Sequence, residues 1–252
     1  IENYNLNPRM IFFKNYFEKN ASIPGDYFEF GVYQGSSLIS VALLFKKLGI
    51  KKKVYGFDSF EGFPNYHKYD DFKNFKRLLK KKLITKSHYK DLKSFESIKK
   101  FLGRLSKKNN FFHPKSISSS KDFSNNSYLD LIKKIKFLKL NNIRLIKGDF
   151  KKSIPNFFKK NPNKKIFAAN IDCDLYNSYK IVFDYSWERL SKNGIIYLDE
   201  YYSLKFPGPR IAVNNFIKKT KNALLVKDGV TGNFERWSIK KIGRNWKKLK
   251  RI

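Results

Sequence analysis

Short apolar runs alternate with stretches of helical periodicity along most of this 252-residue chain. Short apolar runs indicate buried strands, whereas apolar positions recurring every three or four residues indicate helices. Strands are predicted within Tyr27–Phe30, Lys53–Asp58, Ile143–Ile146, Ile166–Tyr176 and Gly194–Tyr201, followed by a hairpin around Gly229–Gly232. Helices are predicted at or near Pro8–Asn20, Ser36–Lys47, Asp71–Leu83, Leu92–Leu105, Ser127–Leu138, Ser153–Lys160, Tyr179–Leu190 and Pro209–Thr220. This alternation predicts an α/β fold with a mostly parallel sheet and helices on both faces.

The segment between the second and third predicted strands is much longer than a parallel crossover, which needs about a dozen residues. It is polar and rich in lysine, with helical patches. We therefore interpret residues 65–142 as a helical insertion within a domain that spans residues 25–252. Residues 1–24 form a separate helical segment, which we expect to act as a lid over a cofactor. The serine- and asparagine-rich part of the insertion, residues 115–127, has the composition of a flexible loop.

Acidic pairs follow two successive predicted strands. Asp172 and Asp174 come after the apolar run that begins at Ile166, and Asp199 and Glu200 come after the next one. The carboxyl ends of neighbouring parallel strands lie about 4.8 Å apart at one edge of a sheet. Four carboxylates gathered there are costly unless a positive charge lies among them. A hard cation with oxygen ligands suits this arrangement better than lysine does.

A glycine-containing turn follows the first predicted strand. Gly31 and Gly35 permit a tight turn, and the helix that follows presents free N–H groups. The spacing is not that of the dinucleotide fingerprint. Asp58, at the end of the second strand, is placed to accept hydrogen bonds from a ribose diol, and Glu29 is placed to meet a ligand amine. A nucleoside that carries a cation fits these two acids better than a pyrophosphate does.

Three stretches together resemble the macrocin O-methyltransferase (TylF-type) family. They are EFGVYQGSS (Glu29–Ser37), VYGFDSFEGFP (Val54–Pro64) and the IDCDLYNSY and YLDEYYSLKFPGPRIAVNNF segments of Ile171–Phe216. The resemblance covers about residues 25–220 and leaves the insertion poorly matched. It implies a Rossmann-like class I methyltransferase fold with a seven-stranded, mostly parallel sheet. It also implies that S-adenosyl-L-methionine methylates a sugar hydroxyl with the help of a divalent metal, which we expect to be Mg²⁺.

The resemblance assigns roles to individual residues. The candidate cofactor-binding residues are Glu29, Gly31, Tyr33, Gly35, Ser36, Asp58, Ser59, Asp149 and Asp172. The candidate metal ligands are Asp172, Asp199 and Glu200, and the candidate general base is Asp174. Glu200 departs from the family, which commonly has a second aspartate there. The metal would lower the pKa of the sugar hydroxyl, and Asp174 would take its proton as the oxygen attacks the sulfonium methyl group.

The chain carries a formal net charge of +33, which raises the question of a nucleic-acid partner. Only nine of its 54 basic residues are arginine, the residue that binds bases and phosphates bidentately. The lysines are also spread along the whole chain. We therefore expect a sugar-containing substrate and keep an RNA methyltransferase as the alternative, with a non-catalytic binding protein on the same fold as a third reading. The charge leaves open peripheral contact with anionic surfaces, and the sequence leaves open a homo-oligomer.

Several other residues receive simpler interpretations. No secretory signal pattern is present at the start, and Cys173 is the single cysteine, which favours the cytoplasm and a packed side chain. The histidines, which are His67, His88 and His113, lack metal-ligand spacing and are expected to be solvated within the insertion. Arg210 is expected to pair with an acid or with the cofactor carboxylate. Tyr33, Phe60 and Tyr176 are candidates for the pocket wall or the core.

Overall fold

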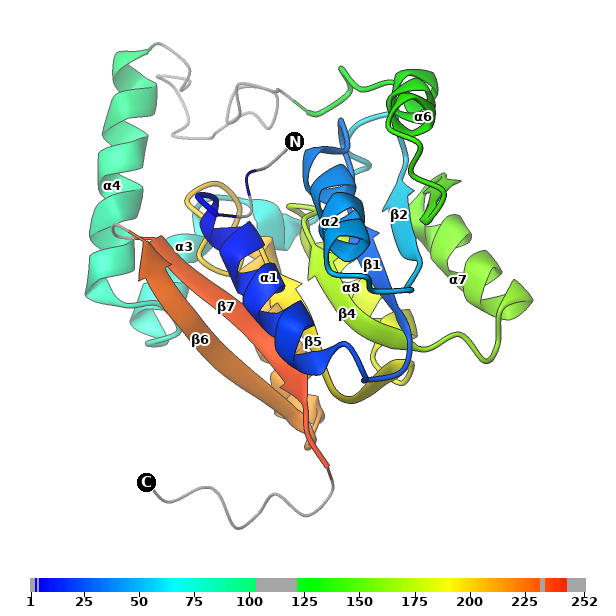
Figure 1. Cartoon of the computed structure of the whole chain (residues 1–252). Helices are drawn as coiled ribbons and strands as arrows, with labels where there is room; N and C mark the ends of the chain where they lie inside the picture. The colour runs from blue at the N-terminus through cyan, green and yellow to red at the C-terminus, as the bar shows by residue number, and fades with distance from the viewer. Residues whose placement is uncertain (1–2, 4, 103–121, 232–233, 244–252) are drawn as a thin grey trace.

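The strand β4 (Ile166–Ile171) is buried at every position and lies in the middle of the sheet. The computed structural model describes residues 3, 5–102, 122–231 and 234–243, and in these residues seven strands form one sheet in the order β3-β2-β1-β4-β5-β7-β6. The first five strands of this order pair in parallel, and β7 runs antiparallel to both β5 and β6 (Figure 1). The other strands are β1 (Asp26–Phe30), β2 (Val54–Asp58), β3 (Ile143–Lys147), β5 (Leu190–Leu198), β6 (Ala223–Thr231) and β7 (Phe234–Lys241). The predicted Rossmann-like fold with a seven-stranded, mostly parallel sheet is confirmed.

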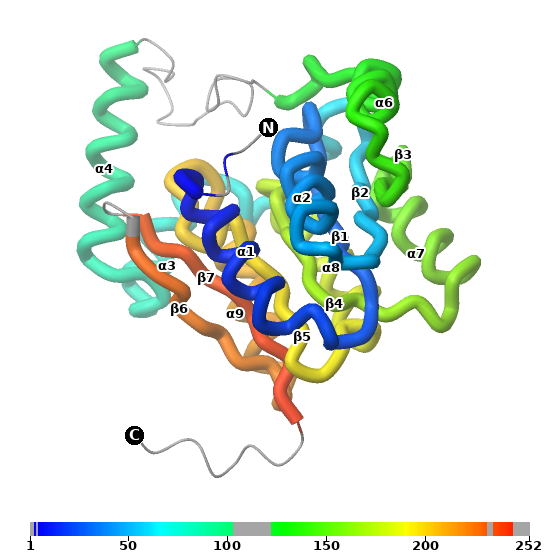
Figure 2. The backbone as a smooth tube through the Cα atoms, in the orientation of Figure 1, coloured from blue at the N-terminus to red at the C-terminus, as the bar shows by residue number. Residues whose placement is uncertain are grey.

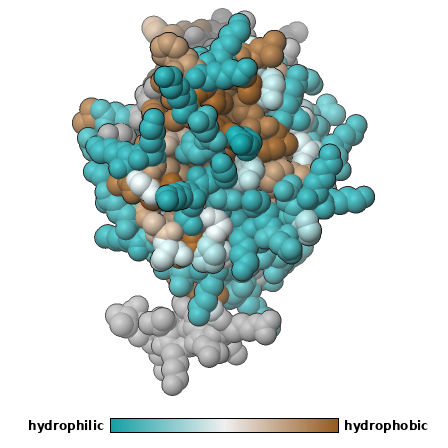
Figure 3. Space-filling view, turned by 45° about the vertical axis from the view of Figure 1, so that its right-hand side comes forward, coloured by the Kyte–Doolittle hydropathy of each residue, from teal (hydrophilic) through white to brown (hydrophobic). Residues whose placement is uncertain are grey.

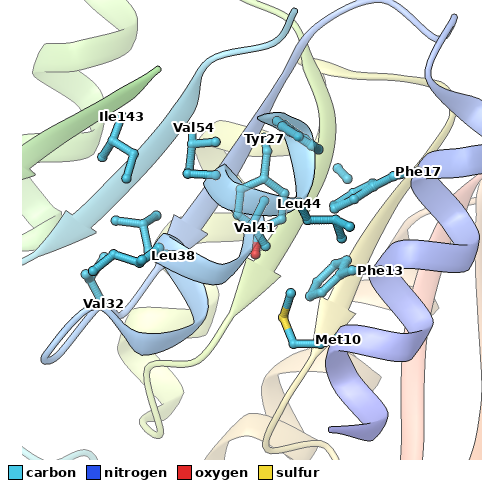
Figure 4. Packing of buried hydrophobic residues seen from close by; sticks show 14 of the residues in the cluster. Met10, Phe13, Phe17, Tyr27, Val32, Leu38, Val41, Leu44, Val54 and Ile143 are labelled. Carbon is cyan, nitrogen blue, oxygen red and sulfur yellow. The ribbon is translucent and has the colours of Figure 1, made fainter. Parts of the chain in front are cut away.

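Helices cover both faces of the sheet because neighbouring strand residues point to opposite sides. Tyr27 of β1 packs in one apolar cluster and Phe28 packs in the other. The first face is covered by α1 (Pro8–Asn20), α2 (Ser36–Lys47) and α6 (Tyr128–Phe137). The second is covered by α7 (Phe150–Lys160), α8 (Tyr176–Ser186) and α9 (Gly208–Lys219). Figure 2 shows α1 and α2 in front of the sheet, and Figure 4 shows Phe13 and Phe17 of α1 among the side chains of the first cluster.

The segment between β2 and β3 forms a helix in each of the three regions where the sequence predicts one, namely α3 (Asn74–Lys80), α4 (Lys86–Phe101) and α6. The helix α4 begins at Lys86, before the predicted Leu92, and the short helix η1 (Lys68–Asp70) is not predicted. In Figures 1 and 2, α3 and α4 lie near the β6–β7 edge of the sheet, whereas α6 lies beside α2. Residues 103–121, which include part of the predicted flexible loop, fall outside the described residues. The lid segment and the bounds of the insertion remain predictions.

Two predicted boundaries are wrong around β5. The helix α8 begins at Tyr176 and ends at Ser186, whereas the sequence suggested a helix from Tyr179 to Leu190 that is closed by Asn193 and Gly194. Leu190 instead begins β5, and Asn193, with φ of 65°, belongs to a bulge within that strand. An Asn-Gly pair therefore marks a strand irregularity here and not the end of a helix.

The surface is mainly hydrophilic on the face shown in Figure 3, with apolar side chains exposed in its upper half. Among the described residues, no helix combines the length and the apolar character that a bilayer crossing needs.

Candidate active site

A cavity of about 310 Å³ opens at the carboxyl ends of β3, β2, β1 and β4. This is the edge of an open α/β sheet at which ligands bind, and the volume suits a small organic ligand. The residues predicted for the site that line this cavity are Gly31, Tyr33, Ser36, Asp58, Ser59, Asp149, Asp172 and Asp174. Glu29, Gly35, Asp199 and Glu200 lie around it without lining it.

The glycine loop after β1 makes close approaches that exclude a side chain. Gly31 has φ of 92°, and a Cβ atom placed on it would lie 1.7 Å from the carbonyl oxygen of Asp172. Gly35 has φ of 83° and is the N-cap of α2, where a Cβ atom would lie 2.3 Å from the Leu131 side chain. The glycines therefore bring the loop against the end of β4 and against α6.

Asp58 organises this loop. Its Oδ2 accepts hydrogen bonds from the backbone N–H groups of Val32 and Tyr33, both at 2.8 Å, and its Oδ1 accepts one from Phe60 at 2.7 Å. The sequence predicts Asp58 as the ribose ligand, and its place in the cavity wall supports that role. The structure adds that this carboxylate joins the turn after β1, through Val32 and Tyr33, to the turn after β2, through Phe60.

Glu29 is fully buried beneath the first turn of α2. Its Oε1 accepts a hydrogen bond from the Ser37 hydroxyl at 2.6 Å, and its Oε2 accepts one from the Tyr27 hydroxyl at 2.9 Å. Burial raises the pKa of Glu29 to about 7, and the nearby Asp172 adds to the rise while Arg9 opposes it. The predicted contact with a ligand amine remains a prediction.

Three further predicted cofactor residues are Tyr33, Ser59 and Asp149, which line the cavity at the ends of β1, β2 and β3. Tyr33 has φ of 51° and donates its hydroxyl to Asn125, 3.0 Å away. Ser59 donates to the carbonyl oxygen of Gly62 at 2.9 Å, which closes the turn after β2. Asp149 is the N-cap of α7 and accepts a hydrogen bond from the Lys151 N–H at 2.7 Å. Capping and ligand binding are compatible for Asp149, because it also lines the cavity.

Three acids meet at the other end of the cavity. One carboxylate oxygen each of Asp172, Asp174 and Glu200 lies within 4.8 Å of the others. Glu200 is buried and accepts a hydrogen bond at 2.7 Å from the hydroxyl of Tyr179. Burial raises the pKa of Asp174 to about 7, with Lys205 opposing the rise and the neighbouring aspartates adding to it. Burial likewise raises the pKa of Glu200. Carboxylates this close repel one another unless a cation or a proton lies among them.

Arg9 is a site residue that the sequence reading missed. Its Nη1 lies 2.5 Å from Asp172 Oδ2 and 3.2 Å from Asp199 Oδ1, so one guanidinium bridges the ends of β4 and β5. Asp199 therefore faces Arg9. The sequence predicts that Asp199 joins Asp172 and Glu200, but the acid that lies with these two in the structure is Asp174. Arg9 is 163 residues away from Asp172 in sequence. The available signal was weak: an arginine in the first turn of a helix whose neighbours Met10 and Phe13 are apolar.

The loop after β5 is held by residues for which other roles were predicted. Arg210 donates to the carbonyl oxygens of Leu83 and Tyr201, at 3.0 and 3.1 Å, and its guanidinium lies over the Tyr201 ring. The hydrogen bonds of Arg210 within the described residues therefore go to backbone oxygens and not to an acid, and pairing with the cofactor carboxylate remains a prediction. This loop carries Asp199 and Glu200, so Arg210 helps to position them.

His88 is buried, and the prediction that it is solvated is wrong. Its ring stacks on Tyr202 with 3.9 Å between centroids, and its Nε2 lies 2.9 Å from the carbonyl oxygen of Ser203. Burial lowers the pKa of His88 to about 4, which keeps the ring neutral. His67 is half-buried and stacks on Tyr176, while His113 lies outside the described residues.

Cys173 lies in the cavity wall between two acids and packs against the second apolar cluster. Burial raises the pKa of its thiol, so the side chain is a protonated packing group, as the sequence suggested.

The comparisons with known proteins agree with this architecture. A family profile described as "Methyltransferase domain" matches residues 28–201. The solved structure of CalS11, a calicheamicin methyltransferase, is 19% identical with a TM-score of 0.62, and the match covers 92% of this chain and 80% of that one. The O-methyltransferase NovP is 16% identical with a TM-score of 0.60, covering 91% of this chain and 79% of that one. None of the curated proteins matches the sequence.

The family profile covers most of the sheet and both acidic strand ends, so the family rests on the part of the chain that forms the cavity. The similarity to CalS11 and NovP, at these identities, establishes the shared fold. A glycine loop, an acid-lined cavity at the strand ends and this profile match agree with one another. The chain belongs to the methyltransferase-domain family and is an S-adenosylmethionine-dependent methyltransferase.

Proposed function

We propose that this methyltransferase transfers its methyl group to a sugar hydroxyl and requires a divalent metal. The observation that carries the proposal is that two of the proposed ligands, Asp172 and Glu200, meet the proposed base Asp174 beside the cavity, with oxygens within 4.8 Å of one another. Oxygen ligands of this kind suit a hard ion such as Mg²⁺. The narrower assignment to the macrocin-type family belongs to this proposal.

The cofactor would occupy the cavity between Asp149 and Asp172. Gly31 supports this placement, because it lines the cavity and its lack of a side chain lets the loop backbone lie against the end of β4. Asp58 and Ser59 line the middle of the cavity, where a ribose would lie. The reacting methyl group would then face the acids at the end of β4.

Asp174 is the proposed general base. A divalent ion held by Asp172, Glu200 and Asp199 would supply the positive charge that lowers the pKa of a sugar hydroxyl. Asp174 has φ of 56°, lines the cavity, and has a pKa raised to about 7, so its carboxylate accepts a proton more readily than an ordinary aspartate. In this proposal Asp172 binds the metal ion, whereas Asp174 takes the proton and does not bind the ion.

The sugar substrate is supported by the proteins of similar fold. CalS11 is described as a TDP-rhamnose 3'-O-methyltransferase, with a TM-score of 0.52 for its apo structure. A sugar offers neighbouring hydroxyl oxygens that can share one metal ion. We therefore propose a nucleotide-linked or glycan-linked sugar as the substrate class.

The test combines binding and transfer. Calorimetry would measure S-adenosylhomocysteine and Mg²⁺ binding to wild type and to Glu200→Gln, Asp174→Asn and Asp184→Asn. Asp184 is an exposed acid on α8 that pairs with Lys180, so its variant is the control for loss of one negative charge. Methyl transfer to a panel of TDP-sugars would be followed by mass spectrometry.

We expect Glu200→Gln to lose Mg²⁺ binding and transfer while S-adenosylhomocysteine still binds, because Glu200 does not line the cavity. Asp174→Asn should keep both ligands and lose transfer. Full transfer in the presence of a chelator would contradict the metal requirement. Transfer to RNA with no transfer to any sugar would replace the proposal with the alternative.

A further inference from the structure

We propose that Arg9 binds the α-carboxylate of the methionine part of the cofactor. This inference rests on S-adenosylmethionine occupying the cavity. It gives the N-terminal helix α1 a direct role in cofactor recognition.

The order of the strands sets the direction of the cofactor. The cavity runs along the ends of β3, β2, β1 and β4, which are marked by Asp149, Asp58, Gly31 and Asp172. Adjacent strands lie about 4.8 Å apart, so these four ends span about 14 Å. A ribose held at Asp58, with the base toward Asp149, leaves the amino-acid part to extend past Gly31 to the end of β4.

The acids at the end of β4 attract the positively charged groups of the methionine part of the cofactor and repel its carboxylate. Asp172, Asp174, Asp199 and Glu200 all lie there, so an ammonium group and a sulfonium group are attracted. A carboxylate is repelled by the same acids. Of the described residues that line the cavity, two are cationic: Lys151, which lies beside Asp149, and Arg9, which lies beside Asp172. Arg9 is therefore the cation in the cavity wall at the end where the α-carboxylate would lie.

The position of Arg9 at the cavity is fixed by the packing of α1 and by its ion pairs. Its side chain is 13% exposed, and Met10, Phe13 and Phe17 anchor α1 in the first apolar cluster. A guanidinium donates through several nitrogens in one plane, which matches the geometry of a carboxylate. Paired with Asp172, it presents one positive and one negative group side by side, which complements the two charges of an amino acid.

The experiment separates the carboxylate from the rest of the ligand. Calorimetry without metal would use three probes: S-adenosylhomocysteine, its analogue with a 3-aminopropyl group that lacks only the carboxylate, and 5'-methylthioadenosine, which lacks the whole amino-acid part. The proteins would be wild type, Arg9→Met, Arg9→Lys and Lys19→Met. Lys19 is an exposed residue at the other end of α1, so its variant removes the same charge from the same helix.

For Arg9→Met we expect S-adenosylhomocysteine to bind about tenfold to a hundredfold more weakly, the usual effect of losing a hydrogen bond between charged groups. The aminopropyl analogue should bind as well as to wild type or better, because the acids then attract its ammonium group more strongly. Arg9→Lys should recover part of the loss, and Lys19→Met should match wild type. These results would support direct recognition of the carboxylate.

Equal weakening of all three probes by Arg9→Met would overturn the inference, because Arg9 would then act only by holding Asp172 and α1 in place. In that case the proposed function would stand, since wild type would still bind S-adenosylhomocysteine. Failure of wild type to bind any of the three probes would overturn the cofactor site itself, together with this inference. Thermal unfolding of each variant would verify that it is folded.

Discussion

The hydrogen bonds of Asp58 lead to a prediction about stability as well as binding. The carboxylate accepts three backbone N–H groups, from Val32, Tyr33 and Phe60. In Asp58→Asn, one of the two oxygens becomes an NH₂ donor. The best orientation keeps the carbonyl oxygen toward Val32 and Tyr33, so the Phe60 N–H loses its acceptor and meets another donor.

The expected cost follows from that count. An unsatisfied donor costs about 1–3 kcal/mol, and the two remaining bonds lose their charge-assisted strength. Because Asp58 is only half-buried, water offsets part of this loss. We expect the free energy of unfolding of the ligand-free protein to fall by about 2–3 kcal/mol. Binding of S-adenosylhomocysteine should weaken as well, because the glycine loop loses its anchor.

Urea unfolding of the ligand-free protein, followed by circular dichroism, would measure the change. Asp149→Asn is the matched control, since Asp149 also lines the cavity but its carboxylate accepts a backbone hydrogen bond only from Lys151 among the described residues. Its expected cost is less than about 1 kcal/mol, because the side-chain oxygen of an asparagine caps a helix as well as that of an aspartate does. An Asp58→Asn protein as stable as wild type that has nonetheless lost its ligand would refute the reasoning, because Asp58 would then act only as a ligand group.

Two further predictions follow from Gly31 and Glu29. Gly31→Ala should abolish S-adenosylhomocysteine binding, measured by calorimetry, since its Cβ would lie 1.7 Å from the carbonyl oxygen of Asp172. Gly49→Ala is the control and should bind normally, because Gly49 also has a positive φ, of 67°, but has nothing within 4 Å of its Cβ position. Equal binding by both variants would contradict this prediction. Below pH 4.5 Glu29 is protonated in both the folded and the unfolded protein. Between pH 4.5 and about 7 the unfolded protein releases this proton while the folded protein retains it, because the pKa of Glu29 is raised to about 7 in the folded state. The free energy of unfolding therefore falls as the pH rises through this range. The stability advantage of Glu29→Gln over wild type should therefore grow by about 3 kcal/mol from pH 4.5 to above 7, and a constant difference in urea unfolding across that range would disprove it.

The local pattern of the chain determined its fold class and the edge at which the site lies. Apolar runs of strand length, separated by helical stretches, permit little besides a parallel α/β sheet. Parallel strands deliver their last residues to one edge, so acids that follow two strands must meet there. For this reason Asp58, Asp172 and Asp174 could be placed at one edge before any contact was known, whereas Asp149 was assigned to the site by the family resemblance.

Tertiary structure alone decided how the charges at that edge are paired. Arg9 meets Asp172 across 163 residues, and no periodicity in the sequence reports such a contact. The same contact turns Asp199 toward Arg9 and leaves Asp174 in the group with Glu200. The side chain of an acid at a strand end can point to either neighbour, and only the packing of α1 against the sheet selects one.

The supporting residues follow the same rule. His88 appears in a lysine-rich stretch that suggests solvent, yet it is buried because α4 packs against the loop after β5. Arg210 holds that loop through two backbone oxygens that lie far apart in sequence. The sequence by itself determined which elements form and which acids share an edge, because both depend on local periodicity. Which groups bind one another there depends on contacts between distant segments, and these exist only once the helices have packed.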